Sequence, residues 1–481
     1  MLKFIIDDIT WNDLSMDKVY ENINTASSSV GREYLKRVLK TLLFDEHELK
    51  KRSERASYFQ KNSSGYKKTF KDLGVSKKIS LYDYIFKFNE LKSESNLIHY
   101  ILILLLLLSI ALIFINPVLG IIALVVMFAV NIATYFRFKA KIESYFQCFK
   151  YIVKMLSAAG KIVKEYDGEE SLSENIEDLR RDIKKLAALK KGSWLITNSV
   201  SGSLTDVILD YVRMLFHVDI IKFNNMKKIA ADNAEVIDNL YCTLGEIEAD
   251  ICIAEFRNKY EGSWVTPSFG FDSLKCSGVF HPLVKNPVKN DIDAKRPVLL
   301  TGSNASGKST FLKTIAINQI FAQTLFTCLA ESFCTKFYKV ISSMALSDNI
   351  LNKESYFIVE IKSLKRIFDE ISEIPVLCFV DEVLRGTNTK ERIAASSAIL
   401  KKLSEENTLC FAATHDMELT EILKDVMDNY HFEEHIENGD VGFDYVLKPG
   451  PSKTRNAIKL LDSYGFDKSI IGEATAMLEQ C

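Results

Sequence analysis

The stretch TGSNASGKST, from Thr301 to Thr310, decides how the C-terminal part of this chain folds. It follows the short apolar run PVLL (Pro297–Leu300) and fits the pattern G-x-x-x-x-G-K-[ST]. Glycines in this pattern let backbone N–H groups turn inward onto phosphate oxygens, and the helix that follows points its N-terminus at the same charge. A strand before the loop and a helix after it therefore predict a nucleotide-binding site. The fixed positions of the pattern are Gly302, Gly307, Lys308 and Ser309.

Two side chains of this loop have separate expected roles. Lys308 is expected to reach the β- and γ-phosphates, and the Ser309 hydroxyl is expected to bind Mg²⁺. The loop alone does not distinguish ATP from GTP. The other residues expected to line the phosphates are Gly302, Ser303, Asn304, Ala305, Ser306, Gly307 and Thr310.

A second apolar run, VLCFVDE (Val376–Glu382), ends in two adjacent carboxylates. An aspartate at the end of such a strand is placed to hold Mg²⁺ through water, which is the role expected of Asp381. The adjacent Glu382 is placed to orient or deprotonate the attacking water. Two adjacent carboxylates favour hydrolysis over binding alone, whereas the same pair without the loop would be interpreted as a solvated strand end.

A third apolar run, LCFAATH (Leu409–His415), ends in a histidine. In an open α/β sheet the ligand lies at the carboxyl ends of the strands, so His415 is expected to sense the γ-phosphate. A histidine outside such a context would more often be an ordinary core or surface residue. From Gly270 onward, short β-rich runs alternate with helical runs, which predicts a parallel α/β sheet with a domain boundary near residue 265.

The stretch from His99 to Phe136 contains no charged residue and is long enough for two membrane spans. Asn116-Pro117 near its middle predicts a turn between helices over residues 98–115 and 118–136. The basic residues that follow this stretch predict that both termini lie in the cytoplasm, at the inner face of the cytoplasmic membrane, and that the Asn116-Pro117 turn reaches the far side. The alternative is a buried hairpin inside a large soluble domain. The basic residues that follow the stretch are Arg137, Lys139 and Lys141.

The remainder of the chain is charged and mostly helical in pattern. With 61 basic and 63 acidic residues the net charge is −2, so the bulk charge predicts neither a nucleic-acid nor a membrane partner. Nine cysteines form no C-x-x-C pair, which argues against a zinc site and fits a reducing compartment. The start, MLKFIIDDITWNDL, lacks the apolar run of a signal peptide. We predict helical segments over 1–96 and 138–264, a transmembrane hairpin over 97–137, and an α/β domain over 265–481.

These motifs resemble, in order and spacing, the C-terminal ATPase domain of the MutS mismatch-repair family, a branch of the ABC-type ATPases. The resemblance is carried by TGSNASGKST, ESYFIVEI, VDEVLRGTNT and ATHDMELT. It extends to HPLVKNPVKNDI (His281–Ile292) before the loop and to Tyr445–Phe466 near the end. Residues Asn24–Glu54 resemble, less specifically, the start of that family's helical core, or lever. The resemblance implies an α/β P-loop ATPase domain of the ABC type, joined to a helical lever that the hairpin interrupts.

The family's roles carry over position by position. The resemblance implies ATP with Mg²⁺, a catalytic Glu382, a switch His415, and Lys308 and Asp381 in the roles given above. It also implies that Ser355, in ESYF, is presented to the γ-phosphate of a second subunit, so that a homodimer would hold two composite sites. Three departures from the family pattern remove no ligand group, so hydrolysis is expected to survive. They are Ser303 for proline, Ala305-Ser306 for Met-Gly, and Leu384 for glycine.

The pattern of the helical core begins by residue 24, so we expect no mismatch-reading domain before it. The Phe-x-Glu pair of that reader occurs four times, in stretches that fit helix or ATPase domain, and we interpret all four as chance. Two basic stretches could bind DNA phosphates, anionic lipid, or only water. The Phe-x-Glu matches start at Phe44, Phe88, Phe368 and Phe432, and the basic residues are Lys67, Lys68, Lys71, Lys77, Lys78, Arg180, Arg181, Lys184, Lys185, Lys190 and Lys191.

Three functions are left open by the sequence. The first is a membrane-anchored MutS-like ATPase whose dimer binds DNA without reading its sequence, linked to mismatch repair or damage sensing. The second is an ATP-driven membrane scaffold or switch that no longer binds DNA. The third, an ABC-type transporter, needs more membrane spans than one hairpin offers, and no LSGGQ-type motif is present.

Overall fold

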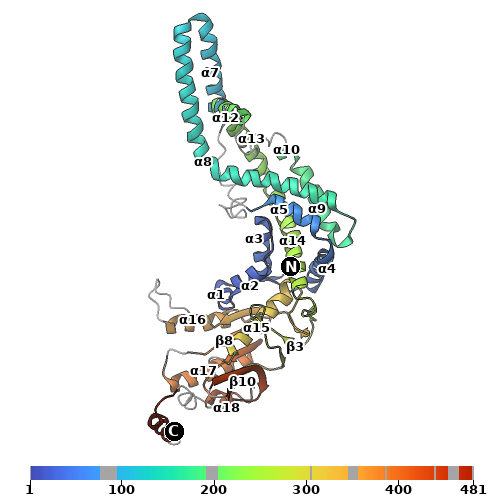
Figure 1. The fold of residues 1–481 in the computed structure, drawn as a ribbon, viewed down its shortest axis with the longest axis vertical. Coiled ribbons are helices and arrows are strands. Elements are labelled where there is room, and N and C mark those ends of the chain that lie inside the picture. Colours follow the sequence, from blue (N-terminus) through green and yellow to red (C-terminus); the bar gives the residue numbers. More distant parts are fainter. Residues whose placement is uncertain are drawn as a thin grey trace. The chain divides into compact units, whose positions relative to one another are not determined.

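The structure is a computed structural model, which describes residues 2–75, 95–190, 204–303, 306–344, 356–384, 387–437, 440–452 and 465–478. It is mostly helical and contains one mixed sheet and two smaller antiparallel sheets (Figure 1). Contacts within the chain define two compact units, which we call the sheet unit and the helical unit. The sheet unit comprises Met1–Asn24, Lys36–Glu54 and Ile253–Cys481, and the helical unit comprises Thr25–Leu35 and Arg55–Cys252.

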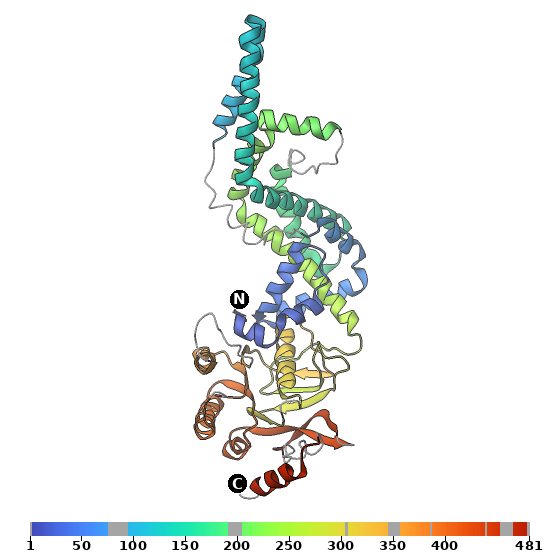
Figure 2. The same cartoon turned by 60° about the vertical axis from the view of Figure 1, so that its left-hand side comes forward.

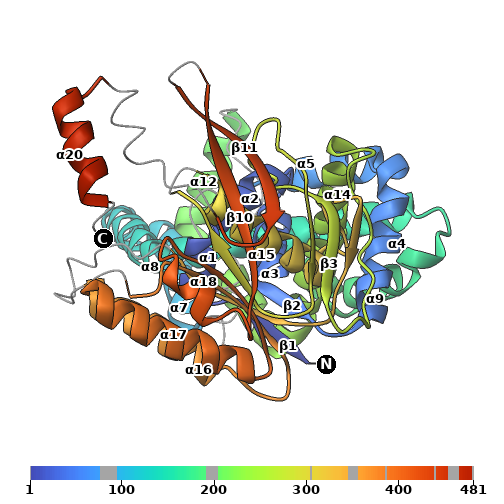
Figure 3. The same cartoon turned by 90° about the horizontal axis from the view of Figure 1, so that it is seen from below.

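The main sheet of the sheet unit has six strands in the order β11-β10-β5-β9-β8-β7. Five of them are parallel, and β11 pairs antiparallel with β10 as a long ribbon (Figure 3). The central strands are buried along nearly their whole length, which explains their continuous apolar runs. The strands are β5 Val298–Thr301, β7 Lys339–Ser343, β8 Val376–Asp381, β9 Thr408–Ala413, β10 Asp428–Glu437 and β11 Asp440–Pro449.

Helix α15 (Lys308–Thr324) follows β5 and is buried from Phe311 almost without interruption. Its polar residues are satisfied inside the unit, as buried amides must be. The Asn318 amide donates to the Phe280 carbonyl at 3.2 Å and its oxygen accepts from the Leu329 N–H at 2.7 Å. The remaining elements of this unit after residue 265 are β3 Leu274–Val279, β4 Asn290–Ala294, β6 Ser332–Cys334, α16 Tyr356–Asp369, α17 Thr389–Glu405, α18 Glu418–Ile422 and α20 Lys468–Leu478.

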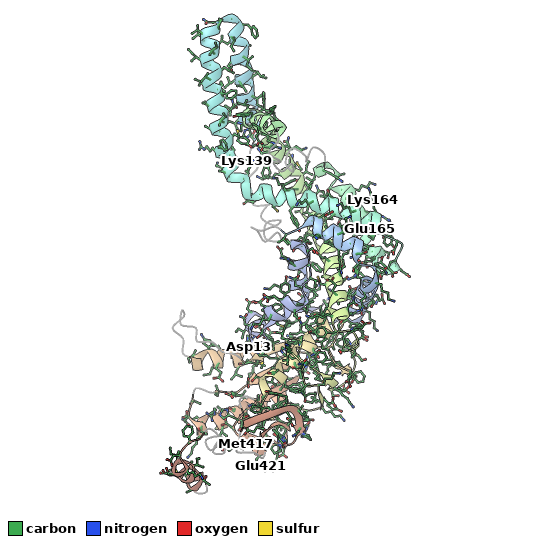
Figure 4. All side chains as sticks on the ribbon, viewed as in Figure 1. Asp13, Lys139, Lys164, Glu165, Met417 and Glu421 are labelled. Atoms are coloured by element: carbon green, nitrogen blue, oxygen red, sulfur yellow. The ribbon has the colours of Figure 1, made fainter. Side chains whose placement is uncertain are left out.

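The first residues of the chain belong to the sheet unit. The Asp13 carboxylate accepts from the Ser342 hydroxyl at 2.7 Å and from the Met344 N–H at 2.9 Å, which ties it to the end of β7 (Figure 4). No local pattern of the sequence predicted this grouping, and the four domain ranges given above stay predictions. The N-terminal elements of the unit are β1 Lys3–Ile5, α1 Asp8–Asp13, α2 Met16–Ile23 and β2 Thr41–Leu43, with β1 paired antiparallel to β2.

The helical unit contains the apolar stretch as two adjacent helices, α7 and α8. The Asn116 side chain accepts from the Leu119 N–H at 3.3 Å and Pro117 opens α8, so the predicted turn is in place. The prediction that the second helix ends at residue 136 is wrong, because α8 continues to Glu165 and changes direction below the hairpin (Figure 1). The helices wholly or partly in this unit are α3 Ser29–Lys40, α4 Glu46–Asn62, α5 Ser64–Leu73, α7 Leu97–Ile115, α8 Pro117–Glu165, the 3₁₀ turn Glu170–Leu172, α9 Ser173–Lys185, α10 Ala187–Lys190, α12 Leu204–Phe216, α13 Val218–Asp232 and α14 Ala234–Lys259.

By length and composition, Leu97–Ile115 and Pro117–Ile142 are each apolar enough to cross a membrane. Only 17% of the apolar window in each helix is buried within the chain, so most of these side chains face outward. The core helix of a soluble domain would instead be covered on most sides. At the tip, Gly120 lies against the backbone of Ile113, where a Cβ atom would collide.

A buried carboxylate organises the start of α3 in the helical unit. Glu248 accepts from the N–H groups of Ser27 at 2.7 Å and Ser28 at 3.1 Å, and the Ser28 hydroxyl donates to its other oxygen. Burial raises the pKa of this carboxyl group, and the hydrogen bonds act in the opposite direction. Gly31 lies directly against the carboxylate and leaves no room for a Cβ atom.

Replacement of Gly31 tests this close approach. Gly31→Ala is expected to lower the free energy of unfolding of the helical unit by about 1–2 kcal/mol, because the added methyl group displaces the Glu248 carboxylate. Gly160→Ala is the matched control, since Gly160 lies within α8 and a Cβ there meets no atom within 4 Å. The control gains about 1 kcal/mol of helix propensity. Thermal unfolding followed by circular dichroism measures both, and equal stability of the two variants would contradict the packing described.

Candidate functional site

The loop that follows β5 turns at two glycines in conformations that other residues avoid. Gly302 has φ +138° and Gly307 has φ +106°, and Gly307 caps the N-terminus of α15. A Cβ atom on Gly302 would lie 2.8 Å from the Phe432 carbonyl oxygen, and one on Gly307 would lie 3.2 Å from the Tyr445 ring. The N–H groups at the start of this 17-residue helix are therefore held toward the loop, as anion binding requires.

The structure brings together the side chains predicted to bind phosphate and metal. The Lys308 ammonium donates to the backbone oxygens of Gly302 at 2.6 Å and Ser303 at 2.7 Å, so it curls over the loop. The Ser309 hydroxyl donates to the Asp381 carboxylate at 2.5 Å, across 72 residues of sequence. A hydroxyl beside a carboxylate is an oxygen pair of the kind that Mg²⁺ prefers. The chemical roles of these residues stay predictions, but their expected meeting at the sheet edge is present.

Glu382 and His415 lie side by side at the ends of β8 and β9. The Glu382 N–H donates to the Ala413 carbonyl at 2.9 Å, and Glu382 has φ +56°, which turns the chain sharply after β8. One oxygen of its carboxylate lies 3.5 Å from His415 Nδ1. The predicted general base and the predicted switch histidine are therefore neighbours.

An ion pair that was not predicted from the sequence lies behind His415. Arg392, on α17, donates twice to the Asp416 carboxylate, at 2.9 and 2.6 Å. The hydrogen bond that Arg392 donates to the Asp416 carboxylate is the main cause of a raised pKa of the Arg392 guanidinium. Asp416 also lies 3.7 Å from His415 Nε2. An acidic residue directly after a strand-end histidine was the available signal, because such a residue can fix the orientation of the imidazole ring.

A pocket of about 460 Å³ opens beside the loop, in the sheet unit. Residues 279–290 form one wall, the start of α15 forms the floor, and aromatic rings from β10 and β11 complete it. Its apolar and aromatic side chains could hold a planar group next to the predicted phosphate-binding loop. The segment from His281 was recognised in the sequence only as part of a resemblance and received no role. The aromatic lining residues are Phe280, Phe311, Phe432 and Tyr445.

Two residues that depart from the family pattern, Leu384 and Ser306, have a local structural explanation. Leu384, which stands where the family has glycine, adopts φ +56°, a region that costs a leucine about 1 kcal/mol or more. Its side chain is buried in the core beneath β8 and its N–H donates to the Glu360 carboxylate, which offset this strain. In the phosphate loop, the Ser306 hydroxyl donates to the Ser303 carbonyl at 2.8 Å and closes the turn.

Some predicted residues lie outside the described part of the chain. They are Asn304, Ala305, Ser355, Lys77, Lys78 and Lys191. The other basic residues lie on α5, α9 and α10 of the helical unit. Arg181, on α9, pairs with Asp178 at 2.7 Å, which lowers the positive charge of that face.

The known proteins that resemble this chain belong to one family. A family model, MutS domain V, matches residues 298–481, from the first residue of β5 onward. The DNA mismatch repair protein MutS of Thermus aquaticus is 30% identical over 262 residues, which is 53% of this chain. These matches support a MutS-family assignment for the C-terminal part of the chain. The MutS of Listeria welshimeri is 28% identical over 289 residues, 57% of this chain, and that of Natronomonas pharaonis is 26% identical over 268 residues, 53% of this chain.

The match covers only part of this chain and only part of each MutS protein. The aligned region covers 32% of the Thermus aquaticus protein, 33% of the Listeria welshimeri protein and 31% of the Natronomonas pharaonis protein. The chain thus spans about a third of the length of these relatives. The domain V match includes the phosphate loop, Asp381, Glu382 and His415.

His281, in the pocket wall, is expected to make the free energy of unfolding depend on pH. Burial, and to a lesser extent the charge of Lys313, lowers the pKa of His281 to about 4. The unfolded chain binds this proton near pH 6.5 whereas the folded chain does not, so the free energy of unfolding falls as pH drops from 6.5 toward 4. The loss attributable to His281 approaches about 3 kcal/mol.

His281→Gln is expected to reduce this pH dependence while leaving the slope above pH 7 unchanged. Denaturant unfolding of both proteins at several pH values between 4 and 8 is the measurement, with the slope of stability against pH as the readout. Identical slopes for wild type and variant between pH 6.5 and 4 would show that His281 is not a buried neutral histidine.

Proposed function

We propose that this chain is a membrane-anchored MutS-type ATPase that binds ATP with Mg²⁺ and hydrolyses it. The observation that carries the proposal is the convergence of Lys308, Ser309, Asp381, Glu382 and His415 at one edge of the main sheet. Five parallel strands with the glycine loop after β5 support a P-loop ATPase domain of the ABC type. The domain V match over the same residues supports it independently.

The geometry supports a hydrolytic mechanism. Lys308 would exchange its two backbone carbonyl partners for oxygens of the β- and γ-phosphates, with the N–H groups of the loop and α15 binding the same charge. Ser309 and Asp381 would hold Mg²⁺, which neutralises charge on the phosphates when bound. Glu382 would take a proton from water as the water oxygen bonds to the γ-phosphorus and the bond to the β–γ bridging oxygen breaks. The products are ADP and phosphate.

His415 and the ion pair behind it would connect this chemistry to the protein. Its ring lies between the Glu382 carboxylate and the Asp416 carboxylate that Arg392 holds in place. A histidine fixed in this way can hydrogen-bond the γ-phosphate and release it after hydrolysis. We further propose a homodimer in which Ser355 of each chain completes the site of the other, as the family resemblance implies.

The membrane anchor is proposed from the exposed hairpin. Most of the side chains of α7 and of the apolar part of α8 face outward, and basic residues follow the second apolar segment. This arrangement supports insertion from the cytoplasmic side, at the inner face of the membrane. DNA is the proposed partner of the helical unit, because the relatives are named DNA mismatch repair proteins and α5 and α9 carry exposed lysines. A membrane scaffold that no longer binds DNA is the second candidate, favoured by the pairing of Arg181 with Asp178.

The catalytic assignment is tested by Glu382→Gln. The variant is expected to bind ATP with wild-type affinity and to lose at least about 100-fold in the rate of hydrolysis, because it cannot accept the proton. Lys308→Ala is expected to lose ATP binding itself. Glu421→Gln is the matched control, since Glu421 is an exposed carboxylate of α18 paired with Lys424 (Figure 4). Phosphate release and fluorescent-nucleotide titration are the measurements, and hydrolysis by Glu382→Gln at the control's rate would refute the assignment.

DNA binding is tested by its dependence on salt. The whole protein in a nonionic detergent is expected to bind duplex DNA, with the logarithm of the association constant falling by about 0.9 per phosphate contacted for each tenfold rise in salt. Lys184→Glu on α9 should reduce that slope, whereas Lys365→Glu on α16, where the lysine pairs with Asp369, should not. Anisotropy of a labelled duplex measures both. Absence of binding at the lowest salt, with ATP hydrolysis intact, would favour the scaffold instead.

A further inference from the structure

Helix α12 of the helical unit exposes a stripe of large apolar side chains. Val207, Ile208, Tyr211 and Val212 are 53%, 57%, 54% and 38% exposed. Their spacing places them on one side of a helix. Asp210 and Arg213 lie on the other side of the helix and pair with each other at 2.9 Å. The described part of the chain thus contains an amphipathic helix whose apolar side other described residues leave largely uncovered.

The C-terminal end of α12 is fixed against the hairpin. His217 follows α12 directly and has φ +47°, which turns the chain into α13. Its Nδ1 lies 2.8 Å from Nδ1 of His99 on α7, and its Nε2 lies 3.0 Å from the Asn131 carbonyl on α8. From this point α12 runs crosswise to the two hairpin helices, as the green helix in Figure 2 shows.

The position of this contact along the hairpin sets a depth. Asn131 is 14 residues from Pro117, where α8 begins, which corresponds to about 21 Å of helix. A hydrocarbon layer of about 30 Å that starts at the hairpin tip would end roughly 9 Å further along α8. The end of α12 therefore lies just inside the cytoplasmic boundary. That is the depth at which amphipathic helices lie along a membrane, about 5–10 Å into the boundary between headgroups and acyl chains.

The polar groups around this contact fit the same boundary. The Tyr135 hydroxyl and the Lys139 ammonium both donate to the buried Asp219 carboxylate, at 2.9 and 2.6 Å (Figure 4). These groups satisfy one another between the helices, where lipid offers no partners. Arg137 and Lys141 of α8 are exposed one turn apart, just after the uncharged stretch that ends at Phe136. Such a pair complements the negative charge of anionic headgroups.

We propose that α12 lies in the cytoplasmic face of the bilayer, with Val207, Ile208, Tyr211 and Val212 turned into the lipid. The occupant of the apolar stripe is the anionic phospholipid surface that surrounds the hairpin. Helix α12 contacts both hairpin helices, α7 and α8, so the lipid around the hairpin is the apolar phase next to the stripe. This inference rests on the proposed membrane anchor and extends it, because a hairpin alone fixes the depth of the chain but leaves it free to rotate and tilt. A second helix lying in the surface would restrict that movement.

Tryptophan fluorescence in vesicles tests the inference. The whole protein is reconstituted into phosphatidylcholine and phosphatidylglycerol, with the phosphatidylcholine brominated either in the upper part of the acyl chains or near their ends. Tyr211→Trp reports on α12, Leu107→Trp reports on the exposed side of α7, and Ile422→Trp reports on an exposed position of α18. The spectrum of the parent, with its three tryptophans, is subtracted from each.

Emission from Tyr211→Trp is expected to shift to the blue and to be quenched about twofold by the upper bromines, and less by the deep ones. Ile422→Trp should be unaffected. Quenching of Leu107→Trp without quenching of Tyr211→Trp would overturn the inference while leaving the anchor intact. No quenching of Leu107→Trp would overturn the anchor, and this inference with it. A blue shift of Tyr211→Trp that depends on protein concentration and not on bromine would assign the stripe to a second copy of the chain.

Discussion

The hydrogen bond between Ser309 and Asp381 is the constraint around which the sheet unit is organised. It joins the first turn of α15 to the end of β8, although the sheet order places β9 between β8 and the strand that leads into the helix. The helix contacts β9, β8 and β7 across the face of the sheet, and it is buried there. Its amides are accordingly satisfied inside the unit, as the bonds of Asn318 illustrate. With α15 fixed, the loop before it opens toward the same edge at which Glu382 and His415 meet.

Local sequence patterns predicted the phosphate loop, the helix after it and the polar residues at the strand ends. The glycines of the loop, the helix after it, and carboxylates or histidine at the ends of apolar strands all have sequence signals, and parallel strands bring such ends together. The pocket beside the loop had no such signal, because its walls come from residues 279–290, α15, β10 and β11. Of the ion pair behind His415, Asp416 had a local signal in its position directly after the histidine, whereas Arg392, 24 residues before Asp416, had none. The position of Asp13 against β7 depends on contacts across more than 300 residues and has no counterpart in any local pattern.

The end of the second apolar helix was mispredicted for an instructive reason. The uncharged stretch ends at Phe136, but a change from apolar to charged residues does not by itself end a helix. Neither proline nor glycine occurs between Gly120 and Gly160, and α8 accordingly continues to Glu165. One helix therefore contains both the proposed membrane span and part of the core of the helical unit. In the proposed function, this shared helix is the covalent route by which the anchor and the helical unit affect each other.

The central claim is that one nucleotide site is built from the phosphate loop and the Ser309–Asp381 pair. Its most direct test is the effect of Mg²⁺ on ATP affinity, measured by calorimetry on the whole protein and on a Ser309→Ala, Asp381→Asn double variant. Mg²⁺ should tighten ATP binding to the wild type at least tenfold, which is about 1.4 kcal/mol, and should have little effect on the double variant. Equal tightening in both proteins, or no ATP binding by the wild type, would contradict the account.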